Sequence, residues 1–250
     1  METKHNGGYA ITTCSYYGSP NDFRLSLALE TIKLAKAREV PFVTADNSPG
    51  PVQKILVDAG ALVLPCDEGV TYGEKRRRAL GHVLDGGLIA AVMEPEKSSL
   101  IPFLDLLAWE IQCGADMVIP WRRSLDSYPS YQRILEPYCN WEAFGIIGGS
   151  TMYDLWSGIR IIGKGVAAQV FRAYHGQYGN DSWDSMYAPV PMALHAGAKI
   201  VSVPIDYVHP LSQKEAEEGD EAMDNKRRVQ RDTILACLRW ACKDLRLTSA

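Results

Sequence analysis

The sequence lacks the features typical of secreted, membrane-spanning and nucleic-acid-binding proteins. Its six cysteines are scattered and form no Cys-x-x-Cys pair, which argues against a zinc ribbon or a dithiol redox site. No apolar run reaches the roughly 18 residues needed to cross a bilayer, and the polar N-terminus has no signal-peptide core. With 30 acidic and 26 basic residues, the net charge of -4 gives no general attraction for nucleic acid. We therefore expect a cytoplasmic protein in which any anion binding is local.

The remaining composition is that of an ordinary globular protein. Hydrophobic residues make up 46% of the chain and charged residues 22%, so a packed core is expected. No internal repeat, low-complexity stretch or strong turn signal marks a second domain. We assign residues 1–250 to one domain, with a flexible N-terminus at 1–8 and a C-terminal helical extension at 213–250.

Short apolar runs alternate with segments of helical periodicity. Strands are predicted at 9–14, 40–45, 61–65, 88–93, 117–120, 159–162 and 199–203. Helices are predicted after Asn21 and at 52–59, 74–84, 100–113, 166–174 and 186–196. This alternation predicts an α/β fold with a mainly parallel central sheet flanked by helices. Ligands of such sheets bind beyond the carboxyl ends of the strands, so the polar residues found there are the first candidates for a site.

Polar residues follow the first two predicted strands. Thr12, Thr13 and Ser15 come at the end of the first strand, and Asp46 and Asn47 follow the second. A carboxylate and small polar groups at this edge could hold a base and a ribose. The alternative is ordinary turn chemistry, because Asp-Asn-Ser-Pro-Gly is a common loop composition.

A basic cluster at residues 75–78 begins the third predicted helix, shortly after Gly73. The amides of a helix N-terminus favour an anion, so the cluster suits a diphosphate. Four consecutive side chains point around a helix, and at most two of them can serve one site; Lys75 and Arg78 are our candidates. A solvated basic surface is the alternative.

Glu94-Pro95-Glu96 directly follows the buried strand at 88–93. Two carboxylates at the end of a parallel strand can offer oxygen ligands to a hard divalent cation such as Mg²⁺ or Mn²⁺. The same residues also suit the acidic first turn of the next helix, where carboxylates interact favourably with the helix dipole.

Three arginines and three isolated polar residues complete the candidates. Arg122, Arg123 and Arg133 follow a strand end and could hold an anionic acceptor through bidentate contacts, or lie on the surface. Asp154, Asp184 and His209 occur singly, and a lone Asp or His is more often structural than catalytic.

The order of these segments resembles that of the GT-A glycosyltransferases, in particular the dolichyl-phosphate mannose synthase and mannosylglycerate synthase group. The resemblance extends over about residues 9–210 and rests on the order of motifs that are individually weak. It implies one GT-A domain that binds a nucleotide-sugar donor, a UDP- or GDP-sugar. The chain lacks the membrane anchors found in many relatives.

The resemblance also implies roles for individual residues. Asp46 would contact the base, and the segment from Gly73 to Arg78 would help to fix the donor. Glu94 and Glu96 stand where the group has Asp-x-Asp, and with His209 they would hold Mn²⁺ or Mg²⁺; glutamate for aspartate is a departure from the pattern. Asp184 is our first candidate for the catalytic base and Asp154 the second.

We therefore predict a hexosyltransferase that moves a sugar from a nucleoside-diphosphate sugar to an acceptor hydroxyl, with metal assistance. A nucleotidyltransferase is less favoured, because residues 12–18 lack the glycine-rich phosphate loop of that class. A non-catalytic nucleotide-sugar-binding protein is a third interpretation, in which the altered acidic motif is a lost metal site.

Overall fold

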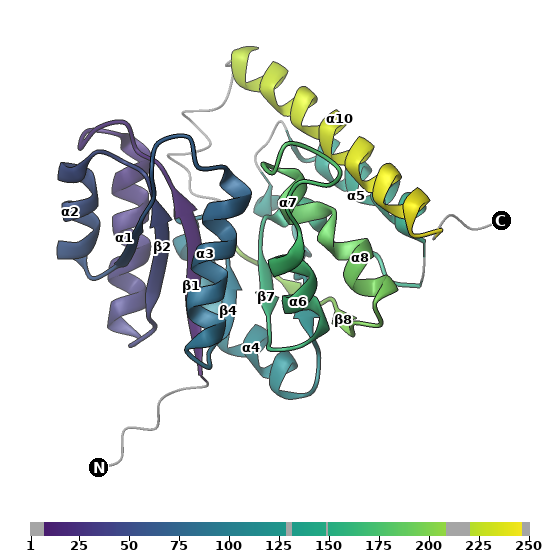
Figure 1. Ribbon diagram of the computed structural model, residues 1–250, viewed down its shortest axis with the longest axis horizontal. Helices are drawn as coiled ribbons and strands as arrows, with labels where there is room; N and C mark the ends of the chain where they lie inside the picture. Colours follow the sequence, from purple (N-terminus) through teal and green to yellow (C-terminus); the bar gives the residue numbers. More distant parts are fainter. Residues whose placement is uncertain (1–7, 129–131, 149, 209–220, 247–250) are drawn as a thin grey trace.

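The computed structural model describes residues 8–128, 132–148, 150–208 and 221–246 (Figure 1). Its centre is a seven-stranded sheet with the order β3-β2-β1-β4-β7-β5-β8. These strands are β1 (Tyr9–Ser15), β2 (Phe42–Asp46), β3 (Leu62–Pro65), β4 (Ile89–Val92), β5 (Met117–Val118), β7 (Arg160–Ile162) and β8 (Ile200–Val201). All seven predicted strands are present, so the expected α/β fold with a mainly parallel sheet is confirmed.

Strand β7 is the exception to the parallel arrangement. It runs antiparallel to both of its neighbours, β4 and β5, and pairs Arg160 with Val92. The start of β7 therefore lies beside the end of β4. The turn before β7 and the turn after β4 are neighbours for this reason. A small second sheet pairs β6 (Trp121–Arg122) with β9 (Pro204–Ile205) in parallel.

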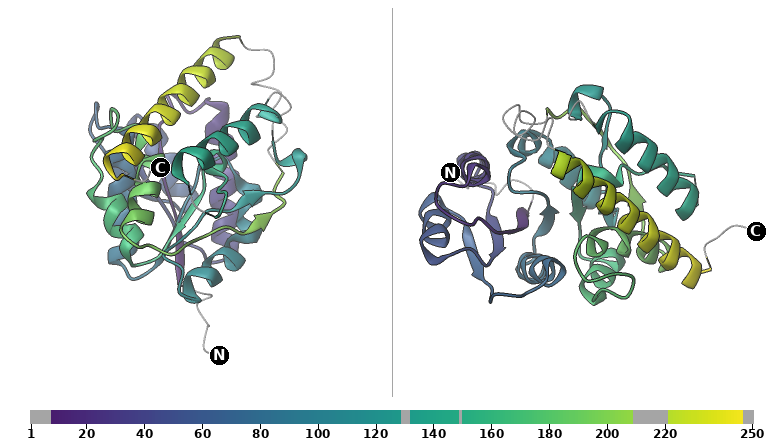
Figure 2. Two further views of the ribbon diagram at one scale, coloured as in Figure 1. Left: turned by 90° about the vertical axis from the view of Figure 1, so that its right-hand side faces the viewer. Right: turned by 90° about the horizontal axis from the view of Figure 1, so that it is seen from above.

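Helices cover both faces of the sheet, because successive strand residues point to opposite sides (Figures 1 and 2). Ile11 contributes to the core on one face and Ala10 to the core on the other. The first face is covered by α1 (Phe23–Ala37), α2 (Gly50–Ala59), the 3-10 helix η1 (Ser98–Phe103) and α4 (Leu104–Gln112). The second is covered by α3 (Tyr72–Asp85), α5 (Leu135–Ile147), α6 (Val166–Ala173), α7 (Asp184–Tyr187), α8 (Pro189–His195) and α10 (Glu221–Asp244).

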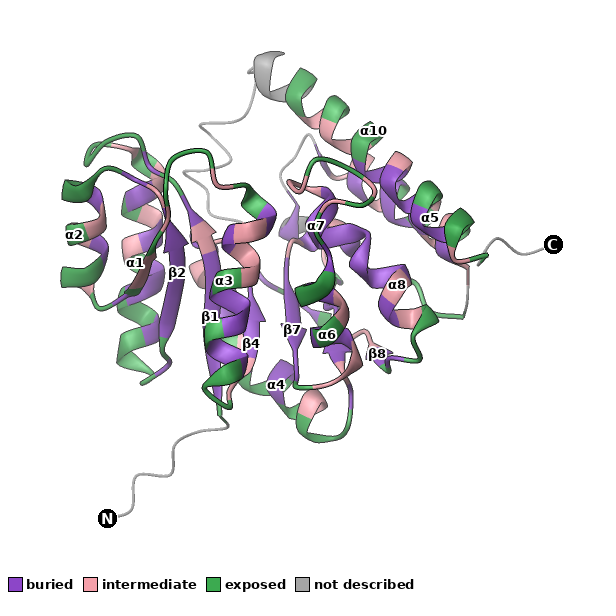
Figure 3. Cartoon of the chain, in the orientation of Figure 1, coloured by how far each residue is buried: buried purple, intermediate pink, exposed green. Residues whose placement is uncertain are grey.

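Helix α10 is the main part of the predicted C-terminal helical extension. It packs against α5, α7 and α8, with an apolar side that is buried and an outer side that is exposed (Figure 3). Ile234, Leu238 and Ala241 belong to the core on this face. Among the helices of the described residues, none is long and apolar enough to cross a membrane.

Helix boundaries differ from the predictions by one to three residues where a cap decides them. Asp22, rather than Asn21, caps α1, because its side chain accepts a hydrogen bond from Arg24 N at 3.0 Å. Thr71 caps α3 by accepting from Glu74 N at 3.1 Å, so that helix begins two residues earlier than expected.

The start of α3 also approaches the loop before α7 closely. Gly73 N donates to Asp181 O at 2.7 Å, and a Cβ at Gly73 would lie 2.0 Å from the Asp181 carboxylate. Only glycine permits this contact, which holds α3 and α7 side by side.

Two 3-10 turns, η2 (Leu125–Ser127) and η4 (Leu155–Ser157), lie in the connections on either side of α5.

Candidate active site

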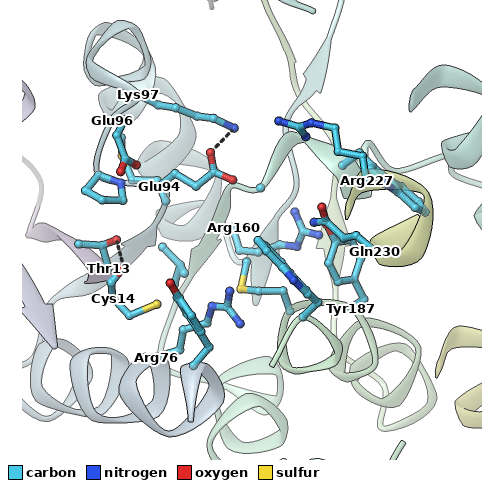
Figure 4. A pocket seen from close by; sticks show the side chains of 18 of the residues that line it. Thr13, Cys14, Arg76, Glu94, Glu96, Lys97, Arg160, Tyr187, Arg227 and Gln230 are labelled. Carbon is cyan, nitrogen blue, oxygen red and sulfur yellow. Dashed lines mark hydrogen bonds and ion pairs between the residues drawn. The ribbon is translucent and has the colours of Figure 1, made fainter. Parts of the chain in front are cut away.

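A pocket of about 550 Å³ opens beyond the carboxyl ends of β1 and β4 (Figure 4). Its walls come from the end of β1, the start of α3, the turn after β4, the start of β7, and helices α5, α7 and α10. The lining includes Thr13, Ser15, Arg24, Tyr72, Arg76, Glu94, Glu96, Lys97, Glu136, Arg160, Trp183, Tyr187, Lys226, Arg227, Gln230 and Arg231. Its location is the one expected for a ligand of a parallel sheet.

Four of the predicted donor-binding residues form one hydrogen-bonded cluster at the ends of β1 and β2. The Ser15 hydroxyl donates to the Asp46 carboxylate at 2.6 Å. Lys75 Nζ donates to Asn47 Oδ1 at 2.9 Å and to Ser15 O at 3.1 Å. The structure therefore brings Ser15, Asp46, Asn47 and Lys75 together, as the predicted topology requires.

Within this cluster, Asp46 and Lys75 act mainly as supports. The Asp46 side chain is fully buried and also accepts from Ser48 N at 2.8 Å and from the Ser48 hydroxyl at 2.9 Å. Ser15 lines the pocket, as does Thr13, whereas Thr12 is buried beside it and does not. The predicted contact between Asp46 and a base therefore remains a prediction.

In the basic cluster, Arg76 is the member that reaches the pocket. Its Nη1 donates to Ser182 O at 2.7 Å and to the Ser185 hydroxyl at 2.6 Å, which fixes the guanidinium against α7. The guanidinium also lies 5.7 Å from the ring centre of Tyr72 and 5.9 Å from that of Trp183. The stacked rings of Tyr72 and Trp183, whose centres lie 6.4 Å apart, and the Arg76 guanidinium thus form a wall suited to a planar, anionic ligand.

The other arginines of the cluster point elsewhere. Arg77 pairs with Asp181 at 2.7 Å and with Glu74 at 2.9 Å. Arg78 is exposed, pairs with Glu74 at 3.3 Å and is not among the residues that line the pocket. Arg76, and not Arg78, is therefore the arginine of this cluster that lines the pocket, and the predicted donor contact at Arg78 stays a prediction that this geometry does not favour.

The acidic turn after β4 forms part of the pocket wall. Lys97 is buried, and its Nζ lies 3.0 Å from Glu94 Oε2 and donates to Ser157 O at 3.0 Å. Glu94 and Glu96 both line the pocket. Burial, and secondly the charge of Glu94, raises the pKa of the Glu96 carboxyl to about 7.

The chemistry of this turn fits a hard divalent cation that shares its ligands with a bound substrate. Mg²⁺ is commonly held by one or two carboxylates together with substrate phosphates. The described residues contain no group of three acidic, His or Cys side chains able to hold a metal by themselves. Glu94 and Glu96 would supply the protein ligands, and the predicted third ligand, His209, lies outside the described residues.

Arg122 and Asp154, predicted for different roles, bind each other. Arg122 Nε donates to Asp154 Oδ2 at 2.6 Å and Nη2 donates to Oδ1 at 2.8 Å, and Nη1 reaches Glu136 at 2.6 Å. Asn140 donates to the same Asp154 carboxylate at 2.7 Å. Both residues are buried outside the pocket lining, so the geometry favours a structural role for the pair.

Asp184 is also buried and fully engaged. Its carboxylate accepts from the Tyr174 hydroxyl at 2.6 Å and from Ser182 N at 2.8 Å, and it does not line the pocket. Of the remaining predicted acceptor residues, Arg123 forms an exposed pair with Asp206, and Arg133 likewise lies outside the lining. The structure thus brings neither the predicted bases nor the predicted acceptor arginines to the pocket.

Several pocket residues were not singled out from the sequence. Arg160 interrupts the apolar strand at 159–162, and a charged residue in a buried strand is a signal that could have identified it. Lys226, Arg227, Gln230 and Arg231 line the pocket from α10, and only the fold brings this distant helix to the site.

No family model and no curated protein matches the chain. Solved structures of glucosyl-3-phosphoglycerate synthase from Mycobacterium tuberculosis do match. The complex with Mn²⁺, UDP and glucosyl-3-phosphoglycerate has a TM-score of 0.57 at 12% identity, over 94% of this chain and 81% of that chain. The complex with Mg²⁺ and UDP has a TM-score of 0.54 at 12% identity, over 94% and 80%.

This chain has a GT-A fold. The fold that the sequence resemblance implied is therefore confirmed. The complex of the same enzyme with phosphoglyceric acid also matches, with a TM-score of 0.54 at 13% identity over 94% of this chain and 81% of that chain. At this level of identity the likeness establishes the GT-A fold alone, and the narrower dolichyl-phosphate mannose synthase and mannosylglycerate synthase group remains a prediction.

Proposed function

We propose that this protein is a glycosyltransferase that moves a sugar from a nucleoside-diphosphate sugar to an acceptor hydroxyl. The observation that carries the proposal is the convergence of Arg76 with Glu94 and Glu96 in one pocket at the carboxyl ends of β1 and β4. Glucosyl-3-phosphoglycerate synthase, which shares this fold and was crystallised with UDP and Mn²⁺ or Mg²⁺, adds support. A hexose is the sugar class that we propose for the donor.

The donor would lie with its nucleoside toward β1 and α3 and its diphosphate toward Arg76. Thr13 and Ser15 provide polar atoms on the β1 side, and Tyr72 provides an aromatic wall. Lys75 and Asn47 hold the loops that shape this end of the pocket, through the hydrogen bonds described above. A guanidinium matches the oxygens of a phosphate, so Arg76 suits the diphosphate better than a neutral residue would.

Departure of the diphosphate builds negative charge, and stabilising that charge is commonly the largest catalytic contribution in such sites. Arg76 supplies a fixed positive charge for it. Glu94 and Glu96 would hold Mn²⁺ or Mg²⁺, and a bound divalent ion would neutralise part of the same charge. Lys97 keeps Glu94 in place by linking it to the turn before β7.

Asp154 and Asp184 act, in this proposal, as positioning residues. Asp154 holds Arg122 and Glu136 in a buried network, and Glu136 lines the pocket. Asp184 fixes the start of α7, whose Tyr187 also lines the pocket. Asp184 supports the α7 wall against which Arg76 lies, and Asp154 supports the α5 side; neither carboxylate lines the pocket.

The test is turnover of a panel of UDP- and GDP-sugars with Mn²⁺, measured as release of nucleoside diphosphate and as a sugar-acceptor product by mass spectrometry. Arg76→Met is expected to abolish release of the nucleoside diphosphate. Arg78→Met removes the same charged group from a position outside the pocket lining and is expected to leave the release unchanged. Nucleotide-sugar binding without turnover would favour the non-catalytic interpretation. Release of pyrophosphate from a nucleoside triphosphate would favour a nucleotidyltransferase.

A further inference from the structure

Glu136 is a pocket carboxylate that has no role in binding the donor or a metal ion in the proposed function. It lies in the first turn of α5, is buried and lines the pocket. The other carboxylates of the lining are Glu94 and Glu96, and the three do not form one metal-binding group. Asp154 and Asp184 lie outside the lining. Among the described residues, Glu136 is therefore the carboxylate that remains for a reaction of the bound substrates.

Neighbouring side chains hold the Glu136 carboxylate in a fixed position. Arg122 Nη1 donates to its Oε2 at 2.6 Å, and the same guanidinium is anchored by two hydrogen bonds to Asp154. In the amide orientation that satisfies its neighbours, Gln132 donates to Oε1 at 2.7 Å. An ionised carboxylate offers about four acceptor sites, and these contacts occupy one on each oxygen. Each oxygen thus keeps an acceptor site for a substrate hydroxyl.

The charges around Glu136 give it more affinity for a proton than an exposed carboxylate has. Burial raises the pKa of Glu136, the charge of Arg122 opposes that rise, Asp154 adds to it and Lys97 opposes it. Asp154 is also buried, but its contacts with Arg122 outweigh burial and lower its pKa. Of the two carboxylates that share Arg122, Glu136 is therefore the stronger base. A carboxylate with a raised pKa is the better proton acceptor in general base catalysis.

The fold places Glu136 and Arg76 on two sides of the pocket (Figure 1). Arg76 lies on α3, which packs on β1, β2 and α7. Glu136 lies on α5, which packs on α10 and on η4, the turn before β7. In the sheet, β4 separates β1 from β7. A sugar whose diphosphate lies at Arg76 can therefore present the opposite side of its anomeric carbon to the α5 wall.

We propose that Glu136 is the general base of the transfer and that the transfer inverts the anomeric configuration. This rests on the proposed function, since it assigns the proton acceptor of that reaction. The acceptor hydroxyl donates a hydrogen bond to Glu136, and its oxygen forms the new bond to the anomeric carbon. The bond from that carbon to the diphosphate breaks, and its electron pair leaves with the diphosphate. The hydroxyl proton passes to Glu136 and then to water, which restores the carboxylate. Attack opposite to the leaving group inverts the configuration.

The test uses UDP- and GDP-hexoses with Mn²⁺, and water or glycerol as the acceptor. Proton NMR during the reaction should show that an α-linked donor yields the β-configured sugar or glycoside. Glu136→Gln should lower the rate of nucleoside diphosphate release by about 10²- to 10⁴-fold and change the affinity for UDP or GDP by less than about 3-fold. Glu142→Gln is the matched control, because Glu142 lies on the same helix, pairs with Arg239 and lies outside the pocket lining. It should react as the wild type does.

Chemical rescue separates a base from a residue that only supports the wall. Glu136→Ala leaves room for formate, which should restore part of the rate in this variant and leave the rate of Glu142→Ala unchanged. Nucleotide affinity and circular dichroism show that each variant is folded. An α-configured product, an unchanged rate in Glu136→Gln, or a folded Glu136→Ala that formate does not rescue would each overturn the proposal. A folded wild type that releases nucleoside diphosphate from none of the donors would instead overturn the proposed function.

Discussion

At the scale of single residues, Arg76 and Arg78 form a natural pair for testing the donor site. They are two positions apart on α3, but Arg76 lines the pocket and Arg78 is exposed against Glu74. A hydrogen bond to a charged group contributes about 1.5–3 kcal/mol, or about 10- to 150-fold in affinity. Arg76→Met should weaken UDP or GDP binding by that factor and leave nucleoside binding unchanged, as measured by calorimetry. Arg78→Met should change neither; equal losses in the two variants would show a general charge effect instead.

Asp184 offers a test that separates a positioning residue from a catalytic base. Its carboxylate accepts hydrogen bonds from Tyr174 and Ser182 in a site with no exposure. Asp184→Asn should lower the free energy of unfolding by about 1–3 kcal/mol, because an amide nitrogen faces groups that donate. The kcat of the folded variant should change little. A fall of 10²- to 10⁴-fold in kcat with unchanged stability would instead restore Asp184 as the base.

The raised pKa of Glu96 predicts a pH dependence of stability in chelator. The native carboxyl holds its proton up to about pH 7, whereas the unfolded carboxyl loses it near pH 4.5. Because the native state then binds more protons, this group's contribution makes the free energy of unfolding fall as pH rises from about 4.5 to about 7, and it is level above that range. Denaturant titrations of the wild type and Glu96→Gln should differ by this slope. Parallel pH profiles would show that Glu96 has an ordinary pKa.

At the scale of elements, Lys97 joins the turn after β4 to the turn before β7. Its ammonium contacts Glu94 and Ser157 O and is buried. Lys97→Met should lower the free energy of unfolding by about 1–3 kcal/mol, since Ser157 O and Glu94 lose their donor. Lys54→Met, which removes an exposed pair with Asp58, should change it by less than about 1 kcal/mol. The two variants are compared by urea denaturation, and equal effects would contradict the structural role of Lys97.

The strands could be predicted from the sequence because their apolar runs are long enough to require burial, and their parallel order followed from the alternation with helices. The detailed direction of side chains could not. Which arginine of the basic cluster faces the pocket depends on how α3 packs against β1, β2 and α7. The pairing of Arg122 with Asp154, separated by 32 residues, depends on tertiary packing that no local pattern records.

At the scale of the whole molecule, the distribution of charge matters more than its sum. The chain carries a net charge of -4, yet the described pocket lining contains seven Lys or Arg residues and three Glu residues. Part of this excess comes from α10, which brings basic residues more than 200 positions away from β1 to the same cavity. The local anion binding expected from the composition therefore has a definite location, beyond the carboxyl ends of β1 and β4.

The measurement that tests this account most directly is calorimetric titration of the wild-type protein with UDP and with GDP, each in Mn²⁺ and in chelator. We predict that at least one nucleoside diphosphate binds with a stoichiometry of one, that Mn²⁺ strengthens its binding, and that Arg76→Met weakens it. Absence of binding by both nucleotides in Mn²⁺ and in chelator, by protein that is folded by circular dichroism, would contradict the account of this pocket as a nucleotide-sugar site.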